Sequence, residues 1–334
     1  MATTKVKYPI WLDRSFTVPT NLTYAVYKGN DVIYTGMPKS KNDITNIYLR
    51  DILKNYLSSM LTGGDDGDLI KNIEQCGDFY ISVYGEQEPR YEILTWWDWS
   101  YNLDFYNLVS RTDGILSQVV NTHWHPQQII PITFYNSTNI HEYYYNRWQK
   151  DGTVQTDELN TYDTACPVST LTISPASYIN FGIRIDNRLA ISWPEENKRP
   201  CASGSLYYIN QFGGWDSFLL EHNIVESVEV ERQNYQTGSD YLSENFDNSY
   251  IIKSLRNSYK TNTGWLDEKQ SYKIYNHLLT SPMIYFQNFN GDDPQRLIPI
   301  NFTNTSFTKK EFKNTHHLVN YELEFKEANI RLRD

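Results

Sequence analysis

Cysteine is scarce in this sequence: the 334 residues contain only 3, at wide and unrelated spacings. Cys76, Cys166 and Cys201 therefore predict neither a disulfide framework nor a zinc ribbon. Long apolar runs are also missing. No stretch approaches the roughly 18 apolar residues that span a bilayer, and the first residues lack the apolar core of a secretory signal. We expect no membrane span and synthesis in a reducing cytoplasm.

Basic residues are fewer than acidic ones, 30 against 40, which gives a formal net charge of −10. Affinity for duplex nucleic acid comes largely from Lys and Arg contacts to phosphates, and no cluster of these residues stands out. We therefore expect no specific nucleic-acid binding. An excess of acid suits solubility, or the wall of a conduit that must repel DNA.

Strong helix formers are also rare outside a few windows, with only 4 Met, whereas the chain has 27 Tyr, 14 Phe and 9 Trp. Aromatic and β-branched residues favour pleated, half-buried surfaces. The predicted fold class is mainly β with two short amphipathic helices, in two to three domains that are β-sandwich-like, barrel-like or α+β.

Three domains are predicted along the chain. Residues 1–115 combine a hairpin around Gly29, a second hairpin, and a helix over roughly residues 46–61, which indicates a β-sandwich with one helix. Residues 116–204 contain short strands punctuated by prolines, typical of a middle β domain. Residues 205–334 form an α+β domain, with strands on both sides of one helix.

Candidate metal ligands are the histidines of "THWHPQQ". On a strand His123 and His125 would point to one face, as half of a metal site. A third ligand is not visible nearby, and Pro126 indicates that the strand ends there. We therefore predict no metal.

The Trp-rich stretch "WWDWSYNLDFY" contains Asp98 and Asp104. The tryptophans could stack on sugar rings and a carboxylic acid could protonate a glycosidic oxygen, which would suit carbohydrate binding or hydrolysis. Alternating Trp residues also fill the cores of β-sandwiches.

No cofactor or catalytic residue is predicted. "FGGWDS" lacks the spacing and the Lys-Ser/Thr of a phosphate-binding loop, and Ser217 and Cys201 lie outside any recognisable nucleophile motif.

The stretch 261–286 is predicted to be a structural connection, a short helix between strands, and not a functional site. Asp267 and Gln270 suit a capping box, Pro282 forbids continuation of the helix, and His277 falls off the apolar face near the helix C-terminus. Trp265, just before the helix, is expected to fill the core. The predicted apolar face consists of Ile274, Tyr275, Leu278 and Leu279.

The order of these segments resembles that of structural tail proteins from crAss-like phages of Bacteroidetes. The similar segments at the C-terminal end are "YYINQFGGWDSF", "VEVERQNYQ", "YKTNTGWLDE", "LLTSPMIYF", "LIPINF" and "YELEFKEANIRLRD". At the N-terminal end they are "VYKGNDVIYTG" and "DITNIYLRDILKNYL". The matches touch both ends and about half of the chain, and the middle domain contributes little.

The resemblance implies a virion protein without catalytic activity: a tail hub or ring subunit of a short-tailed phage. Such a subunit would form a homo-oligomeric ring around the DNA-ejection channel and contact other tail, portal-proximal or fibre proteins. The structural and assembly candidates are Gly213, Gly214, Trp215, Gly264, Trp265 and Pro282. The alternative is a peripheral tail adhesin or fibre-attachment module whose Trp and Tyr surface binds host glycan.

Overall fold

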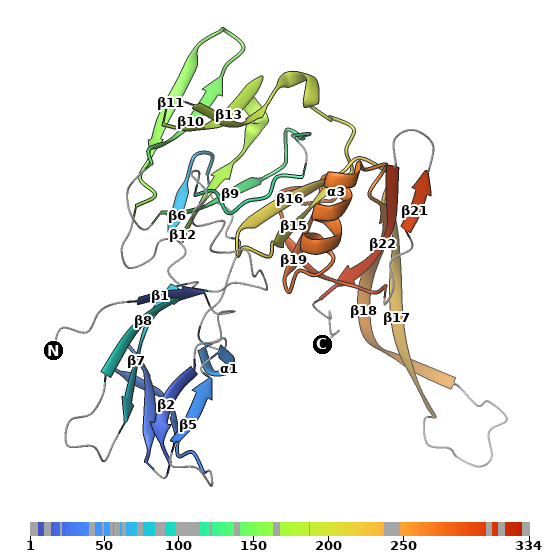
Figure 1. Ribbon diagram of the computed structural model, residues 1–334. Helices are drawn as coiled ribbons and strands as arrows, with labels where there is room; N and C mark the ends of the chain where they lie inside the picture. Colours follow the sequence, from blue (N-terminus) through green and yellow to red (C-terminus); the bar gives the residue numbers. More distant parts are fainter. Residues whose placement is uncertain are drawn as a thin grey trace, which may run out of the picture. The chain divides into compact units, whose positions relative to one another are not determined.

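The protein is described by a computed structural model (Figure 1). The residues it describes are 6–9, 15–20, 22–39, 44–48, 50–53, 56, 61, 65–71, 76–83, 91–97, 114–120, 122–136, 141–162, 168–186, 188–236, 248–304, 309–312 and 318–328.

The chain divides into two compact units, each assembled from separate stretches of sequence. Unit 1 comprises residues 1–119, 129–195 and 209–216, and unit 2 comprises residues 120–128, 196–208 and 217–334. The chain therefore passes between the units repeatedly. The division into three contiguous domains at 115 and 204 stays a prediction.

One sheet of unit 1 contains the two predicted N-terminal hairpins. Its order is β1-β8-β7-β3-β4, with β1 parallel to β8 and the other pairs antiparallel. The strands are β1 (Val6–Pro9), β3 (Tyr24–Lys28), β4 (Asp31–Gly36), β7 (Cys76–Val83) and β8 (Tyr91–Trp97). Inward residues of β3 and β7, such as Val26 and Phe79, lie in a buried apolar cluster with Leu53 of α1.

The helix predicted over residues 46–61 begins later than expected. Residues Ile44–Tyr48 form strand β5, paired antiparallel with β2 (Ser15–Pro19), and α1 spans only Arg50–Leu53 among the described residues. Ile47 and Tyr48 favour a strand, and the ladder to β2 supplies the backbone partners. The spacing of apolar residues alone did not distinguish the two structures.

Two further sheets complete the described part of unit 1. One has the order β6-β12-β9 and the other β11-β10-β13-β14. Their strands are β6 (Leu69–Lys71), β9 (Ile130–Tyr135), β12 (Val168–Ile173), β10 (Tyr143–Trp148), β11 (Val154–Leu159), β13 (Asn180–Ile185) and β14 (Arg188–Trp193). Every residue of β12 is buried, as in a strand covered on both faces.

The largest sheet has the order β16-β15-β19-β20-β22-β18-β17, with β21 also pairing β22. Its strands are β15 (Gly204–Ile209), β16 (Trp215–Leu220), β17 (Val225–Gln236), β18 (Asn248–Asn262), β19 (Ile284–Asn288), β20 (Ile298–Phe302), β21 (Lys309–Phe312) and β22 (Leu318–Glu327). The helix α3 (Glu268–Lys273) continues into the π-helical turn η5 (Ile274–Leu278). Ile274 and Leu278 are fully buried in one apolar cluster with Phe286, Leu323 and Phe325.

Strands β17 and β18 form a long ribbon (Figure 1). β18 pairs β22 only through Ser258–Asn262, and its residues 248–257 pair only β17 among the described strands. A bulge between Glu231 and Arg232 interrupts the register of the ribbon.

The prediction of a mainly β fold is confirmed by several antiparallel sheets with little helix in the described residues. None of the sheets closes into a barrel in the strand orders of this part of the chain. Among the described helices, none is long and apolar enough to cross a membrane.

Candidate functional site

The Gly-Gly-Trp loop between β15 and β16 is organised by Asn210, whose side chain is fully buried. Its Oδ1 accepts hydrogen bonds from the backbone N–H groups of Phe212 (2.8 Å) and Gly214 (3.1 Å). Its Nδ2 donates to the carbonyl of Leu116 and to Asp216 Oδ2, each at 2.9 Å. The side-chain amide of Asn210 therefore bonds to the backbone of the turn through its oxygen, and to Leu116 and Asp216 through its nitrogen.

The predicted candidates Gly213, Gly214 and Trp215 lie in this turn. Gly213 adopts a φ of 78°, which favours glycine, and a Cβ on Gly214 would lie 2.8 Å from the carbonyl carbon of Leu116. Trp215 is buried at 1% exposure, and its backbone N–H donates to Thr133 Oγ1 at 2.9 Å. All three residues therefore have a structural role within the turn, and a role in assembly stays a prediction.

The second Gly-Trp turn, before α3, is built differently. Gly264 has a φ of 73° and its N–H donates to Asn262 Oδ1 at 2.9 Å. Leu266 exchanges backbone hydrogen bonds with Val319 and is buried, whereas the preceding Trp265 is 53% exposed. The expectation that Trp265 fills the core is wrong, because its neighbour Leu266 occupies the inward position.

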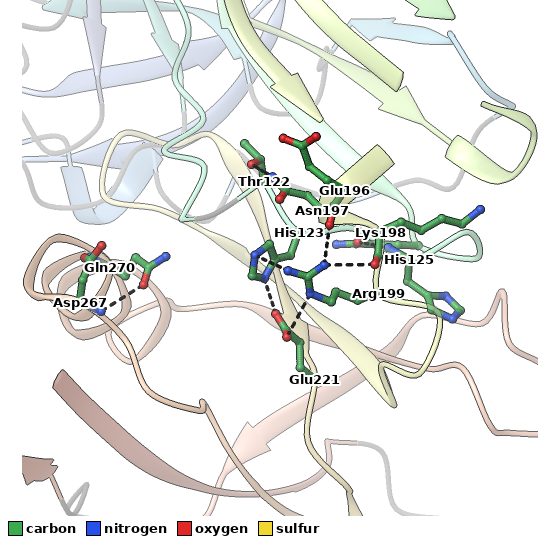
Figure 2. Close-up of polar contacts among 11 residues, drawn as sticks. Thr122, His123, His125, Glu196, Asn197, Lys198, Arg199, Glu221, Asp267 and Gln270 are labelled. Carbon is green, nitrogen blue, oxygen red and sulfur yellow. Dashed lines mark hydrogen bonds and ion pairs between the residues drawn. The ribbon is translucent and has the colours of Figure 1, made fainter. Parts of the chain in front are cut away.

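The predicted capping box is confirmed. The backbone N–H of Gln270 donates to Asp267 Oδ1 at 2.8 Å, and the N–H of Asp267 donates to Gln270 Oε1 at 3.1 Å (Figure 2). The helical segment ends before the bend that contains Pro282, as predicted.

The apolar face of this helix is rotated by about one position from the prediction. Ser271, Ile274, His277 and Leu278 are buried, and Tyr275 is exposed. His277 therefore lies inside rather than off the face, and burial lowers the pKa of His277 to about 4, with a smaller contribution from Lys273.

A cluster of polar side chains in unit 2 surrounds His123 (Figure 2). His123 Nδ1 contacts Glu221 Oε1 at 2.5 Å, and its Nε2 accepts from Arg199 Nη2 at 3.0 Å. Arg199 Nε lies 3.6 Å from Glu221 Oε2, so both carboxylate oxygens are engaged. The hydrogen bond from His123 lowers the pKa of Glu221, which favours the carboxylate.

The cluster joins segments that are far apart in sequence. Backbone bonds from Trp124 N–H to Asn197 O and from Arg199 N–H to Trp124 O align the two extended segments. Asn197 Nδ2 donates to Thr122 Oγ1 at 2.6 Å alongside them. Glu221 lies just after β16. The cluster therefore links all three sequence segments of unit 2, residues 120–128, 196–208 and 217–334.

His125 has a separate environment from His123, and in Figure 2 the two rings lie apart. The ring of His125 stacks on Phe289 with centroids 4.1 Å apart, its Nε2 lies 3.2 Å from Pro200 O, and its Nδ1 accepts from Gln127 N–H. Burial lowers its pKa. His123 and His125 do not lie in a strand, so they do not share a strand face as predicted. No group of three potential metal ligands occurs among the described residues.

The residues nominated for nucleophilic chemistry lie apart from this cluster's hydrogen bonds. Ser217 Oγ accepts a hydrogen bond from Gln128 Nε2 at 3.2 Å, in a group that includes Ser205. Cys76 is buried and Cys201 is exposed, and neither forms a disulfide. Cys166, Asp98 and Asp104 lie outside the described residues.

A group of hydrogen bonds around Asp66 in unit 1 was not predicted from the sequence. Asp66, in the acidic sequence DDGD at residues 65–68, accepts hydrogen bonds from the hydroxyls of Tyr145 (3.1 Å) and Tyr178 (2.7 Å) and from Ser174 N–H (2.8 Å). It also pairs with Arg147 at 3.1 Å, and burial raises the pKa of Tyr145. No local signal could have found it, because the donors lie many residues away along the chain.

Several large apolar side chains of unit 2 are exposed. On β17, Val225 and Val228 are 64% and 53% exposed, and Val230 is also exposed. On α3 and η5, Tyr272 and Tyr275 are exposed at 65% and 59%, near Trp265 in sequence. Isolated exposed apolar residues are common, but recurrence along one edge strand is typical of an interaction surface.

Comparison with known protein families found no match, and comparison with curated protein sequences found none either. Among solved structures, the chain is similar to one described as the tail of an empty GTA particle, computed with helical refinement in C6 symmetry. The match covers 40% of this chain and 85% of that chain, with 12% sequence identity and a TM-score of 0.24. A TM-score this low does not establish a common fold, so the match stands as a weak likeness to one tail particle.

Proposed function

We propose that this chain is a structural subunit of a short-tailed phage tail, in which copies associate into a hub or ring around the DNA-ejection channel and contact other tail components. The observation that carries the proposal is that three valines of the edge strand β17 are exposed. A long edge strand with exposed valines invites pairing with another chain. The resemblance of the segment order to that of phage tail proteins supports the same proposal.

The chemistry of the polar clusters fits a structural rather than a catalytic role. The ring nitrogens of His123, both oxygens of Glu221 and the polar atoms of Asn210 are engaged in contacts that join segments. A general base needs reach to a substrate proton, and a carboxylate held by His and Arg is poorly suited to that task. We propose that the protein is not an enzyme and needs no cofactor.

The test is imaging of the purified chain and of virions by electron microscopy, with labelled antibody to mark the subunit. Closed rings in solution and label on the tail axis are the expected result. A monomer or trimer that binds host polysaccharide and is absent from the axial tail would overturn the proposal.

A peripheral adhesin is the second candidate, favoured by the exposed Trp265, Tyr272 and Tyr275. Aromatic faces stack on sugar rings, so these side chains could bind a host glycan. A glycan array with the wild type and with Trp265→Ala, Tyr272→Ala and Tyr275→Ala separates the two candidates. Binding that is lost in the variants favours the adhesin, and no binding by the wild type excludes it.

A further inference from the structure

We propose that the outer edge of β17 in one subunit pairs with the outer edge of β21 in a second copy of this chain, so that neighbouring copies extend one sheet. This inference rests on the proposed function and names the surfaces that join copies. It begins from topology: β17 ends the strand order of the largest sheet, and among the described strands β21 pairs only β22. Each strand therefore presents one edge that no described strand covers.

The length of β17 favours a partner strand. At about 3.3 Å per residue its 12 residues span ~40 Å, and part of that length belongs to a ribbon of only two strands. A two-stranded ribbon is marginally stable in water without further packing. A strand added along the β17 edge would satisfy backbone N–H and C=O groups and cover the valines.

Charge selects the partner edge. Described residues of β17 include the exposed acids Glu226 and Glu229, whereas β21 contains Lys309 and Lys310 in its sequence KKEF. Pairing β17 with a second β17 across a twofold axis would bring glutamates toward glutamates, which is unfavourable in cross-strand pairs. Pairing with β21 would instead set the glutamates of β17 beside a strand whose sequence carries two lysines and one glutamate.

Two different edges joined in this way make a heterologous contact, which generates a closed ring or an open helix rather than a twofold dimer. The ladder itself would be short, because the four residues of β21 span only about 13 Å. Packing on Val225, Val228 and Val230 would therefore contribute to the contact as well.

Charge reversal with rescue tests the pairing. The acidic-edge variant is Glu226→Lys with Glu229→Lys, the basic-edge variant is Lys309→Glu with Lys310→Glu, and a third chain combines all four changes. We expect each edge variant alone to weaken self-association by roughly tenfold or more, and the combined chain to recover. Mass photometry across a concentration series measures association, and incorporation into particles in an infected host is the second readout.

The matched control is Glu158→Lys with Glu195→Lys, which makes the same charge change at exposed positions in β11 and after β14. It should assemble like the wild type. Because Glu229 lies 3.9 Å from Lys326 within the chain, Glu226→Lys alone is a second variant without that contact. Thermal melting of every variant separates loss of assembly from loss of folding.

Each outcome decides between the proposals. If the wild type assembles and the acidic-edge variant assembles equally well, or if the combined chain fails to recover, the β17–β21 pairing is overturned while the tail-subunit function stands. If the wild type neither self-associates nor enters particles, the proposed function itself fails.

Discussion

Two turns of this protein share a Gly-Trp pair and a glycine with positive φ, yet their tryptophans have opposite environments. Trp215 is 1% exposed in unit 1, and Trp265 is 53% exposed in unit 2. In the first turn the tryptophan begins β16 at a buried position. In the second, backbone pairing with Val319 buries Leu266 and turns the preceding residue outward.

The difference shows that strand register, not the local motif, decides which residue is inside. Successive side chains in extended structure point to opposite sides, so a shift of one residue exchanges core and surface. Asn210 fixes the first turn through bonds to Phe212 and Gly214. The second turn is fixed instead by pairing with β22 and by the capping box.

Among substitutions in the two turns, we expect the largest effect on the free energy of unfolding at Trp215. Trp215→Ala removes a fully buried ring and should lower the free energy of unfolding by about 3–5 kcal/mol. Urea denaturation followed by circular dichroism measures it. Trp215→Phe is the control and should lose less, because most of the buried volume remains. Wild-type stability of the alanine variant would show that the first turn is not packed as described.

Leu266 provides the corresponding test in the second turn. Leu266→Ala should lower the free energy of unfolding by about 2–5 kcal/mol, because a buried leucine packed with Ile274 and Val319 is truncated. The same denaturation experiment applies, with Leu189→Ala as the control, since Leu189 is exposed on β14. If the control loses as much as Leu266→Ala, burial does not explain the difference.

Much of the fold could be predicted from the sequence. The hairpin around Gly29 and the second N-terminal hairpin were predicted correctly, as the pairs β3-β4 and β7-β8. The helix over residues 46–61 was misplaced at its start, because Ile47 and Tyr48 suit a strand as well as a helical face and only pairing with β2 decides. Local propensity cannot contain that information.

The environments of the candidate residues were less predictable. Gly213, Gly214 and Trp215 were predicted only as structural and assembly candidates, and the inward position of Leu266 depends on pairing with residue 319. The contacts of His123 with Arg199 and Glu221, and of Asp66 with Tyr178, join distant segments. Without knowledge of which strands are neighbours, no spacing rule reveals them.

His277 makes the second turn's helix sensitive to pH. Burial holds its pKa in the folded protein near 4, below the ordinary value of 6.5, so the unfolded chain binds the proton first as the pH falls. Stability is therefore full above pH 6.5 and is lost as the pH falls toward 4. His277 should account for about 2 kcal/mol of loss between pH 7 and pH 5. Urea denaturation of the wild type and of His277→Leu at pH 7 and pH 5 measures the part of this loss that comes from His277. An equal loss in the leucine variant would contradict the assignment.

The smallest effect on folding is expected at Trp265. Trp265→Ala should change the free energy of unfolding by no more than about 0.5 kcal/mol, because an exposed side chain loses little packing when truncated. Denaturation beside Trp215→Ala makes the comparison direct, since the same truncation is made in two turns of related sequence. A loss as large as that of Trp215→Ala would mean that Trp265 is buried in the folded chain. Unchanged folding with weaker self-association would instead assign the exposed ring to a contact between subunits, where aromatic residues contribute most of their energy by leaving water.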